Sequence, residues 1–316
     1  MPAMHLIIPY AAPSSQGFAA ALANLKLPNL QKLLARLQPA PPDSGDAFSL
    51  SPPQERALAA AWGLSSADGQ IPWAALQAHQ VGHAANSAWA FITLCHWQVN
   101  TGHVAMSQLP LPALSEVQSA ALLEAMQPYF EEDGITLMAD ESGRWLAQGE
   151  IFRDLATASP DRVVGRNLAA WMTTSPQAAP LRRLQNEMQM LLYTHPVNDA
   201  RETLNLTPVN SFWLHGSGAL PDGYQPPPVN VQPTVINMLK PLALTDNWPG
   251  WAQAWQALDT GDIASLLQTA ATGQAVQLTL CGERSSQTWV TQPQPVWQKF
   301  KSLFGSQPLS ELLEKL

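Results

Sequence analysis

The stretch "THPVNDARETLNLTPVNSFWLHGSG", residues 194–218, decides the fold of this chain, because it links the end of one helix to a strand and a glycine turn. The spacing of apolar residues predicts a helix over 181–195, which ends where this stretch begins. His195 and Pro196 follow that helix, where a histidine complements the negative end of the helix dipole and a proline stops the helix. We therefore expect His195 to cap a helix C-terminus.

The middle of the stretch has local signals of its own. Asp199 and Glu202 have the spacing of a capping box, which predicts a short helix that begins at Asp199. Asn198 suits a turn just before that helix, since asparagine side chains hydrogen-bond to nearby backbone groups. Asn198, together with Arg201 and Asn210, could instead contact a ligand, and the residue pattern leaves both interpretations open.

The strand "VNSFWLHGSG", residues 209–218, ends in a histidine and a Gly-Ser-Gly turn. Both alternating faces carry bulky apolar groups, so we expect the strand to be buried on both sides, as parallel strands are. Ligands of α/β sheets bind beyond the carboxyl ends of strands, and glycines let backbone amides approach an anion. A turn and a ligand site both fit this end of the strand. The candidate ligand-binding residues are His195, Asn198, Arg201, Asn210, His215, Gly216, Ser217 and Gly218.

Composition argues against several classes of protein. The 316 residues carry a net charge of −8, and no basic run offers the electrostatic footprint of a nucleic-acid binder. No run of roughly 18 apolar residues occurs, so we expect no membrane span. Cys95 and Cys281 are isolated, which indicates neither a disulfide framework nor a zinc cluster. Unpaired cysteines suit a reducing compartment, so we expect a cytoplasmic protein with no nucleic-acid or membrane partner.

Apolar periodicity along the rest of the chain predicts both strands and helices. Residues 86–150 read as strand, strand, helix, strand, strand, with the last two strands, "ITLMAD" and "RWLAQG", joined as a hairpin, which predicts a compact α+β unit. Ser115 and Gln118 have the spacing of a capping box at the start of its helix. The tail over 296–316 has helical spacing. Further strands are predicted at 5–9 and 275–282, and further helices at 27–37, 51–64, 249–258 and 262–271.

Four stretches of the chain carry distinctive motifs: "LPNLQKLLA", "SAWAFITLCHWQV", "LSEVQSAALLEAM" and "HPVNDARETLNLTPVNSFWLHGSG". They resemble motifs of one enzyme family, the cofactor-independent phosphoglycerate mutases of archaeal type, in the alkaline phosphatase superfamily. The chain is more similar still to the RpfE-type regulatory proteins of bacteria, and the likeness covers roughly residues 1–220. It implies an α/β fold with an alkaline-phosphatase-like, mostly parallel sheet flanked by helices. The implied core is 1–84 and 181–316, and the implied inserted α+β cap-like domain is 85–180.

The chemistry of that family depends on residues that this chain replaces. Such mutases hold two divalent metals with Asp and His side chains, and a serine is transiently phosphorylated. Where the family has its first metal-binding aspartate, this chain has Pro9-Tyr10, and Gln54 stands at the place of the serine. No histidine follows His215 in the sequence, and the carboxylates beyond it have no paired spacing. We therefore expect no metal site and no cofactor.

The favoured hypothesis is a non-catalytic relative of these mutases that regulates by binding a small phosphorylated metabolite or a protein partner. The first alternative is an active phosphoglycerate mutase that uses a divalent metal such as manganese, or another phosphotransfer enzyme rebuilt around His195, Arg201 and His215. The second alternative is a structural interaction module with a tryptophan-rich surface. That surface would consist of Trp248, Trp251 and Trp255.

Overall fold

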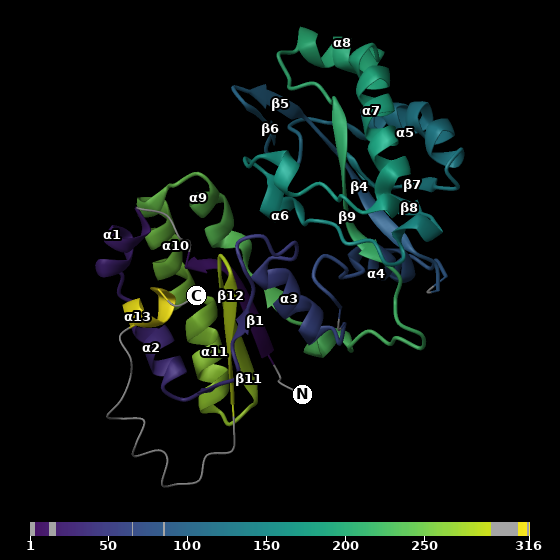
Figure 1. Ribbon diagram of the computed structural model, residues 1–316. Helices are drawn as coiled ribbons and strands as arrows, with labels where there is room; N and C mark the ends of the chain where they lie inside the picture. The colour runs from purple at the N-terminus through teal and green to yellow at the C-terminus, as the bar shows by residue number, and fades with distance from the viewer. Residues whose placement is uncertain (1–3, 13–16, 65, 85, 292–308, 315) are drawn as a thin grey trace. The chain divides into compact units, whose positions relative to one another are not determined.

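The computed structural model divides the chain into two compact units (Figure 1). The first unit consists of Met1–Ala47, Pro52–Leu64 and Pro226–Leu316, and the second of Phe48–Ser51 and Ser65–Gln225. The structure describes residues 4–12, 17–64, 66–84, 86–291, 309–314 and 316. Much of the tail with helical spacing, residues 296–308 and 315, lies outside the described residues.

A mixed sheet forms the centre of the first unit. Its strands are β1 (Met4–Ala12), β2 (Gln38–Pro39), β3 (Asp43–Ser44), β10 (Thr234–Val235), β11 (Val276–Gly282) and β12 (Ser285–Val290). Their order is β10-β1-β11-β12-β2, with β3 also paired to β12. The strands predicted at 5–9 and 275–282 are confirmed as β1 and β11.

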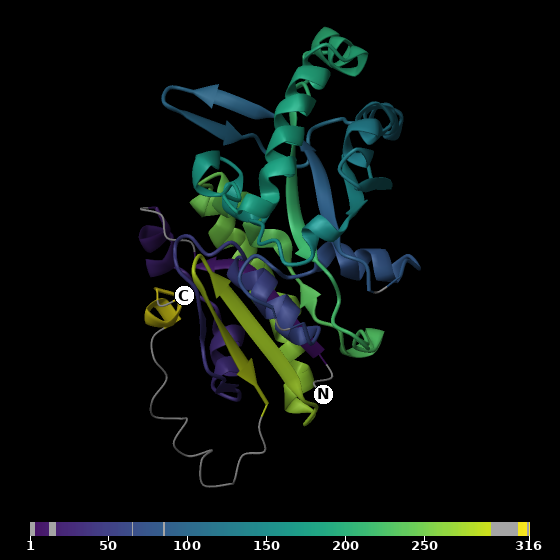
Figure 2. The ribbon, with the colours of Figure 1, turned by 45° about the vertical axis from the view of Figure 1, so that its right-hand side comes forward.

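The expectation of a mostly parallel sheet is wrong. Only β10, β1 and β11 run parallel to one another, whereas β12 runs antiparallel to β11, β2 and β3. Figure 2 shows β11 and β12 side by side as two yellow-green arrows. A tight turn joins them, and a connection that short permits only antiparallel pairing, because a parallel crossover needs a dozen or more residues.

Helices pack against both faces of this sheet. One face contributes alternate residues such as Leu6, Ile8 and Leu278 to an apolar core with α2, α10 and α11. The opposite face carries α3. The helices of the first unit are α1 (Phe18–Ala23), α2 (Pro28–Leu34), α3 (Pro53–Ala61), α9 (Lys240–Leu244), α10 (Trp248–Thr260), α11 (Asp262–Ala271) and α13 (Leu309–Glu314), with 3-10 turns η4 (Val229–Val231) and η5 (Asn237–Leu239).

Two tryptophans of α10 fill the centre of that core. Trp251 and Trp255 are both 0% exposed, and Trp251 packs edge-on against Phe18 with 5.4 Å between ring centroids. The predicted tryptophan-rich surface is therefore wrong, because residues four apart share one face of a helix and this face is the buried one. Trp248 is half-buried and packs against the same cluster.

The second unit contains an antiparallel sheet in the order β7-β8-β4-β9. Its strands are β4 (Trp89–Cys95), β7 (Thr136–Glu141), β8 (Arg144–Gln148) and β9 (Ser211–Gly218), and a separate hairpin consists of β5 (Trp97–Asn100) and β6 (His103–Met106). The predicted hairpin of β7 and β8 is confirmed. β9 is buried on both faces, but it pairs antiparallel with β4, so the parallel arrangement expected for it is wrong.

Helices enclose this sheet as well. On one face, α5 and α7 bury residues such as Leu122, Met126 and Leu184 against the strands, and α4 packs on the other. The predicted capping box of Ser115 and Gln118 is confirmed at the start of α5. The helices are α4 (Trp73–Gln80), α5 (Glu116–Glu131), α6 (Pro160–Val163), α7 (Ala179–Tyr193) and α8 (Pro196–Thr203), with 3-10 turns η1 (Glu150–Phe152), η2 (Leu168–Ala170) and η3 (Pro176–Ala178).

The second unit extends beyond the cap-like domain expected over 85–180. It also takes in α7, α8 and β9, because β9 forms an edge of the same sheet as β4.

In the part of the chain that the structure describes, no helix is long and apolar enough to cross a bilayer. Both units combine helices with a sheet, so the α/β class is confirmed.

Candidate functional site

His195 begins a helix rather than ending one. It is the N-cap residue of α8, and its Nδ1 atom accepts a hydrogen bond from the Val197 N–H at 3.2 Å. The preceding helix, α7, has Thr194 as its C-cap. Pro196 occupies the first helical position, where the backbone N–H that proline lacks would have no partner within the helix. The helix therefore begins at Pro196 and not at Asp199 as predicted. The predicted C-cap role of His195 and N-cap role of Asp199 are therefore wrong.

The side chain of Asn198 hydrogen-bonds to three backbone groups. It is 5% exposed, and its Nδ2 atom donates hydrogen bonds to the carbonyl oxygens of Leu192 and Val209, each at 2.7 Å. Its Oδ1 atom accepts a hydrogen bond from the Val209 N–H at 2.8 Å. One buried carboxamide thus joins the last turn of α7 to α8 and to the segment that leads into β9.

Arg201 lies in a cage of carbonyl oxygens and is 0% exposed. Its Nε atom donates to the Thr207 carbonyl at 2.8 Å, and one terminal nitrogen donates to the Pro112 carbonyl at 2.9 Å. The other terminal nitrogen makes longer bonds, 3.4 Å each, to the Ala113 carbonyl and the Gln118 side chain. The guanidinium therefore ties α8 to the loop that precedes α5.

Asn210 and Ser217 also bond mainly to backbone groups. The Asn210 side chain accepts from the Trp97 N–H at 2.7 Å and donates to the Trp97 carbonyl at 2.9 Å, which fixes the start of β5. The Ser217 hydroxyl donates to the Leu155 carbonyl at 2.5 Å and shares a 2.8 Å hydrogen bond with the Thr157 hydroxyl. Ser217 is 0% exposed, so both of its bonds are made inside the protein.

The glycines of the turn allow α4 to approach β9 closely. Gly216 and Gly218 have φ of 63° and 140°, which side chains rarely adopt. A Cβ atom on Gly216 would lie 3.1 Å from the Phe91 ring and 3.2 Å from the Trp73 side chain. On Gly218 it would lie 3.1 Å from the Pro72 side chain. Close packing and backbone geometry together account for both glycines.

His215 is half-buried on the sheet face beneath α4. Its Nε2 atom shares a 2.9 Å hydrogen bond with the Thr93 hydroxyl, and its ring lies 5.3 Å from the Phe91 ring. Burial lowers the pKa of His215 to about 3, with a further contribution from the positive charge of Arg144. Arg144 itself lies over the Phe91 ring at 4.6 Å and makes an ion pair with Asp140. His215 is therefore neutral at physiological pH.

Replacing His215 with glutamine is expected to make the free energy of unfolding fall less steeply as the pH is lowered below about 6.5. In an unfolded chain histidine has a pKa near 6.5, whereas in the folded protein the pKa of His215 is about 3, so the unfolded state takes up the proton first as the pH falls. The contribution of neutral His215 to the free energy of unfolding is therefore complete above about pH 6.5. It is lost progressively below that pH, by up to about 1.4 kcal/mol per pH unit. Glutamine keeps a hydrogen-bonding group near Nε2 and does not titrate.

Urea unfolding at pH 7 and pH 5 measures this effect. Between the two, the wild type should lose about 2 kcal/mol more than His215→Gln, because carboxylate titration is common to both proteins. Equal losses in the two proteins would show that His215 titrates normally.

The eight candidates do not form one constellation. His195, Asn198 and Arg201 lie in or at the start of α8, whereas the His215 turn packs under α4. Across the described ranges, no hydrogen bond or ion pair joins His195, Arg201 and His215 to one another.

The donor residues do not fit the two-metal site of the family that the motifs resemble. Pro9-Tyr10 stands in the place of its first aspartate and offers no carboxylate. Tyr10 there has a φ of 57°, and its carbonyl accepts a hydrogen bond from Trp251 Nε1 at 3.0 Å. Asp259 is 1% exposed and accepts from the backbone N–H groups of Leu30 and Asn29, at 2.7 and 3.2 Å, at the start of α2. Within the described part of the chain, no three His, Cys, Asp or Glu side chains gather as metal ligands would.

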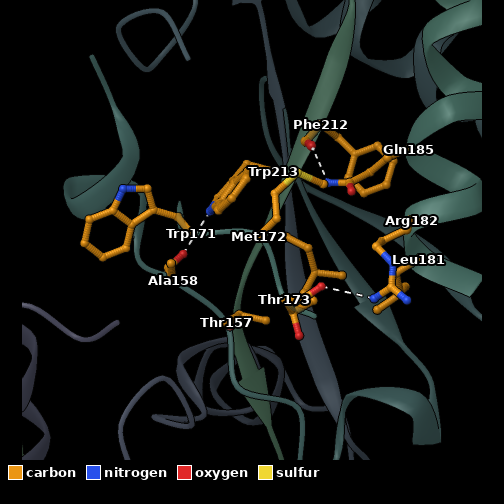
Figure 3. A pocket seen from close by; sticks show the side chains of 11 residues that line it. Thr157, Ala158, Trp171, Met172, Thr173, Leu181, Arg182, Gln185, Phe212 and Trp213 are labelled. Atoms are coloured by element: carbon orange, nitrogen blue, oxygen red, sulfur yellow. Dashed lines mark hydrogen bonds between the residues drawn. The ribbon is translucent and has the colours of Figure 1, made fainter. Parts of the chain in front are cut away.

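Sequence reasoning missed an apolar pocket in the second unit (Figure 3). Trp171, Met172 and Trp213 line it, and Trp213 Nε1 donates to the Ala158 carbonyl at 2.8 Å. Arg182 at its edge donates to the Thr173 carbonyl at 3.1 Å, so its charge faces backbone oxygen. The pocket has a volume of about 30 Å³, which suits two or three water molecules rather than a metabolite. No periodic signal in the loop that carries Trp171 marks this pocket.

Two solved structures resemble the chain at low identity. The cofactor-independent phosphoglycerate mutase of Thermoplasma acidophilum is 13% identical, with 99% of each chain covered and a TM-score of 0.39. A protein from Pyrococcus horikoshii is 11% identical, with 92% of this chain and 88% of that chain covered and a TM-score of 0.43. No protein-family model matches the chain. No curated protein matches it in sequence.

Proposed function

We propose that this chain is a non-catalytic relative of the cofactor-independent phosphoglycerate mutases that regulates by binding a ligand or partner. One observation carries the proposal: the stretch with the most specific mutase-like motif uses its polar side chains to hold the fold. Asn198, Arg201 and Asn210 hydrogen-bond mainly to backbone groups. A buried group bonded in this way is costly to detach, so it is poorly placed to follow a reacting substrate.

The residues at the family's chemical positions support the same proposal. The pair Pro9-Tyr10 offers no carboxylate, and Gln54 offers no nucleophilic hydroxyl. Asp259, which is buried, bonds to the backbone at the start of α2. The proposed setting is the cytoplasm, since Cys95 and Cys281 are free thiols rather than a disulfide.

The proposed ligand contact is the His215 turn. His215 and Gly216 are half-buried, whereas Asn198 and Arg201 are enclosed. Arg144 beside His215 supplies positive charge for a phosphorylated metabolite, although a phosphate there must compete with both Asp140 and Glu141 for the guanidinium. This competition predicts modest affinity.

Thermal shift measurements with 2-phosphoglycerate and 3-phosphoglycerate test the binding part of the proposal. We expect a phosphorylated metabolite to raise the melting temperature without added manganese, because binding to the folded state alone stabilises it. His215→Ala should remove the shift, and His103→Ala, at an exposed position of the same unit, should keep it. A shift that survives His215→Ala would show that the contact lies elsewhere. If no phosphorylated metabolite shifts the melting temperature, ligand binding at this turn is wrong.

A further inference from the structure

The first unit contains a polar cleft on the sheet face opposite its tryptophan core. The cleft has a volume of about 310 Å³, at the lower end of the range for small-molecule sites. Strands β1, β11 and β12 form its floor. α3 forms one wall, and the other is formed by Ala40 and Pro41, which lie between β2 and β3, together with Asp43 of β3. None of the eight candidates discussed above lies in it.

Strand alternation explains why the floor is polar. Leu278 and Leu280 of β11 enter the apolar core, so Gln277 and Thr279 face the opposite side. The register places His5 beside Gln277 and Thr279 opposite Thr288, which brings polar side chains from three strands together. A sheet face used only for packing would be covered with apolar side chains, as the opposite face is.

The floor carries a hydrogen-bonded chain and two further polar side chains. His5 Nε2 bonds to the Thr279 hydroxyl at 2.9 Å, and that hydroxyl shares another 2.9 Å bond with the Thr288 hydroxyl. Ser286 is only 4% exposed and lines the cleft, and Gln277 is half-buried and lines it as well. The hydroxyl of Ser286 and the carboxamide of Gln277 are both hydrogen-bonding groups, so the floor offers donors and acceptors to a molecule in the cleft.

The walls carry no net charge. Arg56 and Asp43 form an ion pair at 2.7 Å, and both line the cleft, so their charges offset each other. Burial lowers the pKa of His5 to about 4, so its ring is neutral at physiological pH. Ala57 and Ala60 of α3 face the cleft with small side chains and leave it open.

We propose that this cleft binds a small uncharged molecule rich in hydroxyl or amide groups, of the size of a pentose or a pyrimidine base. Ser286 and Gln277 would hydrogen-bond to it, and the chain of His5, Thr279 and Thr288 would set the orientation of its donors and acceptors. The ion pair of Arg56 and Asp43 leaves the described lining without a net charge, which favours a neutral ligand over an anion or a cation. This site is separate from the proposed His215 contact, so each can fail without the other.

Isothermal titration of the full chain with D-ribose, with uracil and with inorganic phosphate tests the proposal. We expect saturable binding of ribose, of uracil or of both: ribose alone identifies a hydroxyl-rich ligand, and uracil alone an amide-bearing one. Ser286→Ala should weaken that binding by about fivefold, the value of one hydrogen bond. Ala60→Leu should abolish it, because Ala60 is exposed at the cleft and a longer side chain fills the space.

The matched control is Ala20→Leu, the same substitution on the exposed surface of α1 in the same unit, and it should bind as the wild type does. Unchanged tryptophan fluorescence would confirm that each variant is folded. The proposal is overturned if neither neutral probe binds, if phosphate binds more tightly than both, or if binding survives Ala60→Leu.

Discussion

Replacing Arg201 with methionine should lower the free energy of unfolding of the second unit by about 3–5 kcal/mol. The guanidinium is 0% exposed and donates to the backbone carbonyls of Thr207, Pro112 and Ala113. Methionine fills similar space but donates nothing, so these carbonyls lose a charged partner in a place that water does not easily reach. Urea unfolding followed by near-ultraviolet circular dichroism measures the loss.

Arg153→Met is the matched control, because Arg153 belongs to the same unit but pairs with Glu150 at the surface. An exposed ion pair contributes less than about 1 kcal/mol, so this variant should unfold almost as the wild type does. If Arg201→Met were equally mild, Arg201 would not be holding the fold. A role for Arg201 in ligand binding would then explain its position better than a role in stability.

Trp251→Ala should destabilise the first unit by about 3–5 kcal/mol, the usual cost of truncating a fully buried tryptophan. Trp251 contacts Phe18, Trp248 and Trp255 through its ring, and its Nε1 atom donates to the Tyr10 carbonyl at 3.0 Å. Alanine leaves a cavity and removes the hydrogen bond that Trp251 donates to the Tyr10 carbonyl. Thermal and urea unfolding measure the effect.

Val229→Ala, at a residue of the same unit that is 84% exposed, provides the control and should change stability by less than about 0.5 kcal/mol. A Trp251→Ala variant as stable as this control would restore the idea of a tryptophan surface. The buried position of Trp251 predicts the opposite.

Local signals in the sequence predicted much of the secondary structure. The capping box at Ser115 and the hairpin of β7 and β8 are confirmed, because both depend on residues close together in the chain. The burial of Trp251 and Trp255 could also have been predicted, since their spacing places them on one helix face. A cluster of aromatics by itself fits both a surface and a core, and the four-residue spacing of Trp251 and Trp255 is the signal that favours the core.

Pairing between distant segments could not be predicted in the same way. β9 is separated from β4 by more than a hundred residues, and neither strand's pattern states which partner or direction it takes. The candidate site shows the same limit. Asn198 and Arg201 look like ligand contacts until their carbonyl partners are seen, and those partners include Leu192 and Pro112. The cleft beside α3 had no sequence signal, because its polar floor comes from three strands.

A mutase assay with manganese tests the central claim most directly. The full chain is incubated with 3-phosphoglycerate and manganese, and formation of 2-phosphoglycerate is followed over time. The account predicts no conversion above the protein-free background, at any protein concentration. Manganese-dependent conversion that rises in proportion to the protein and stops when the metal is chelated would contradict it.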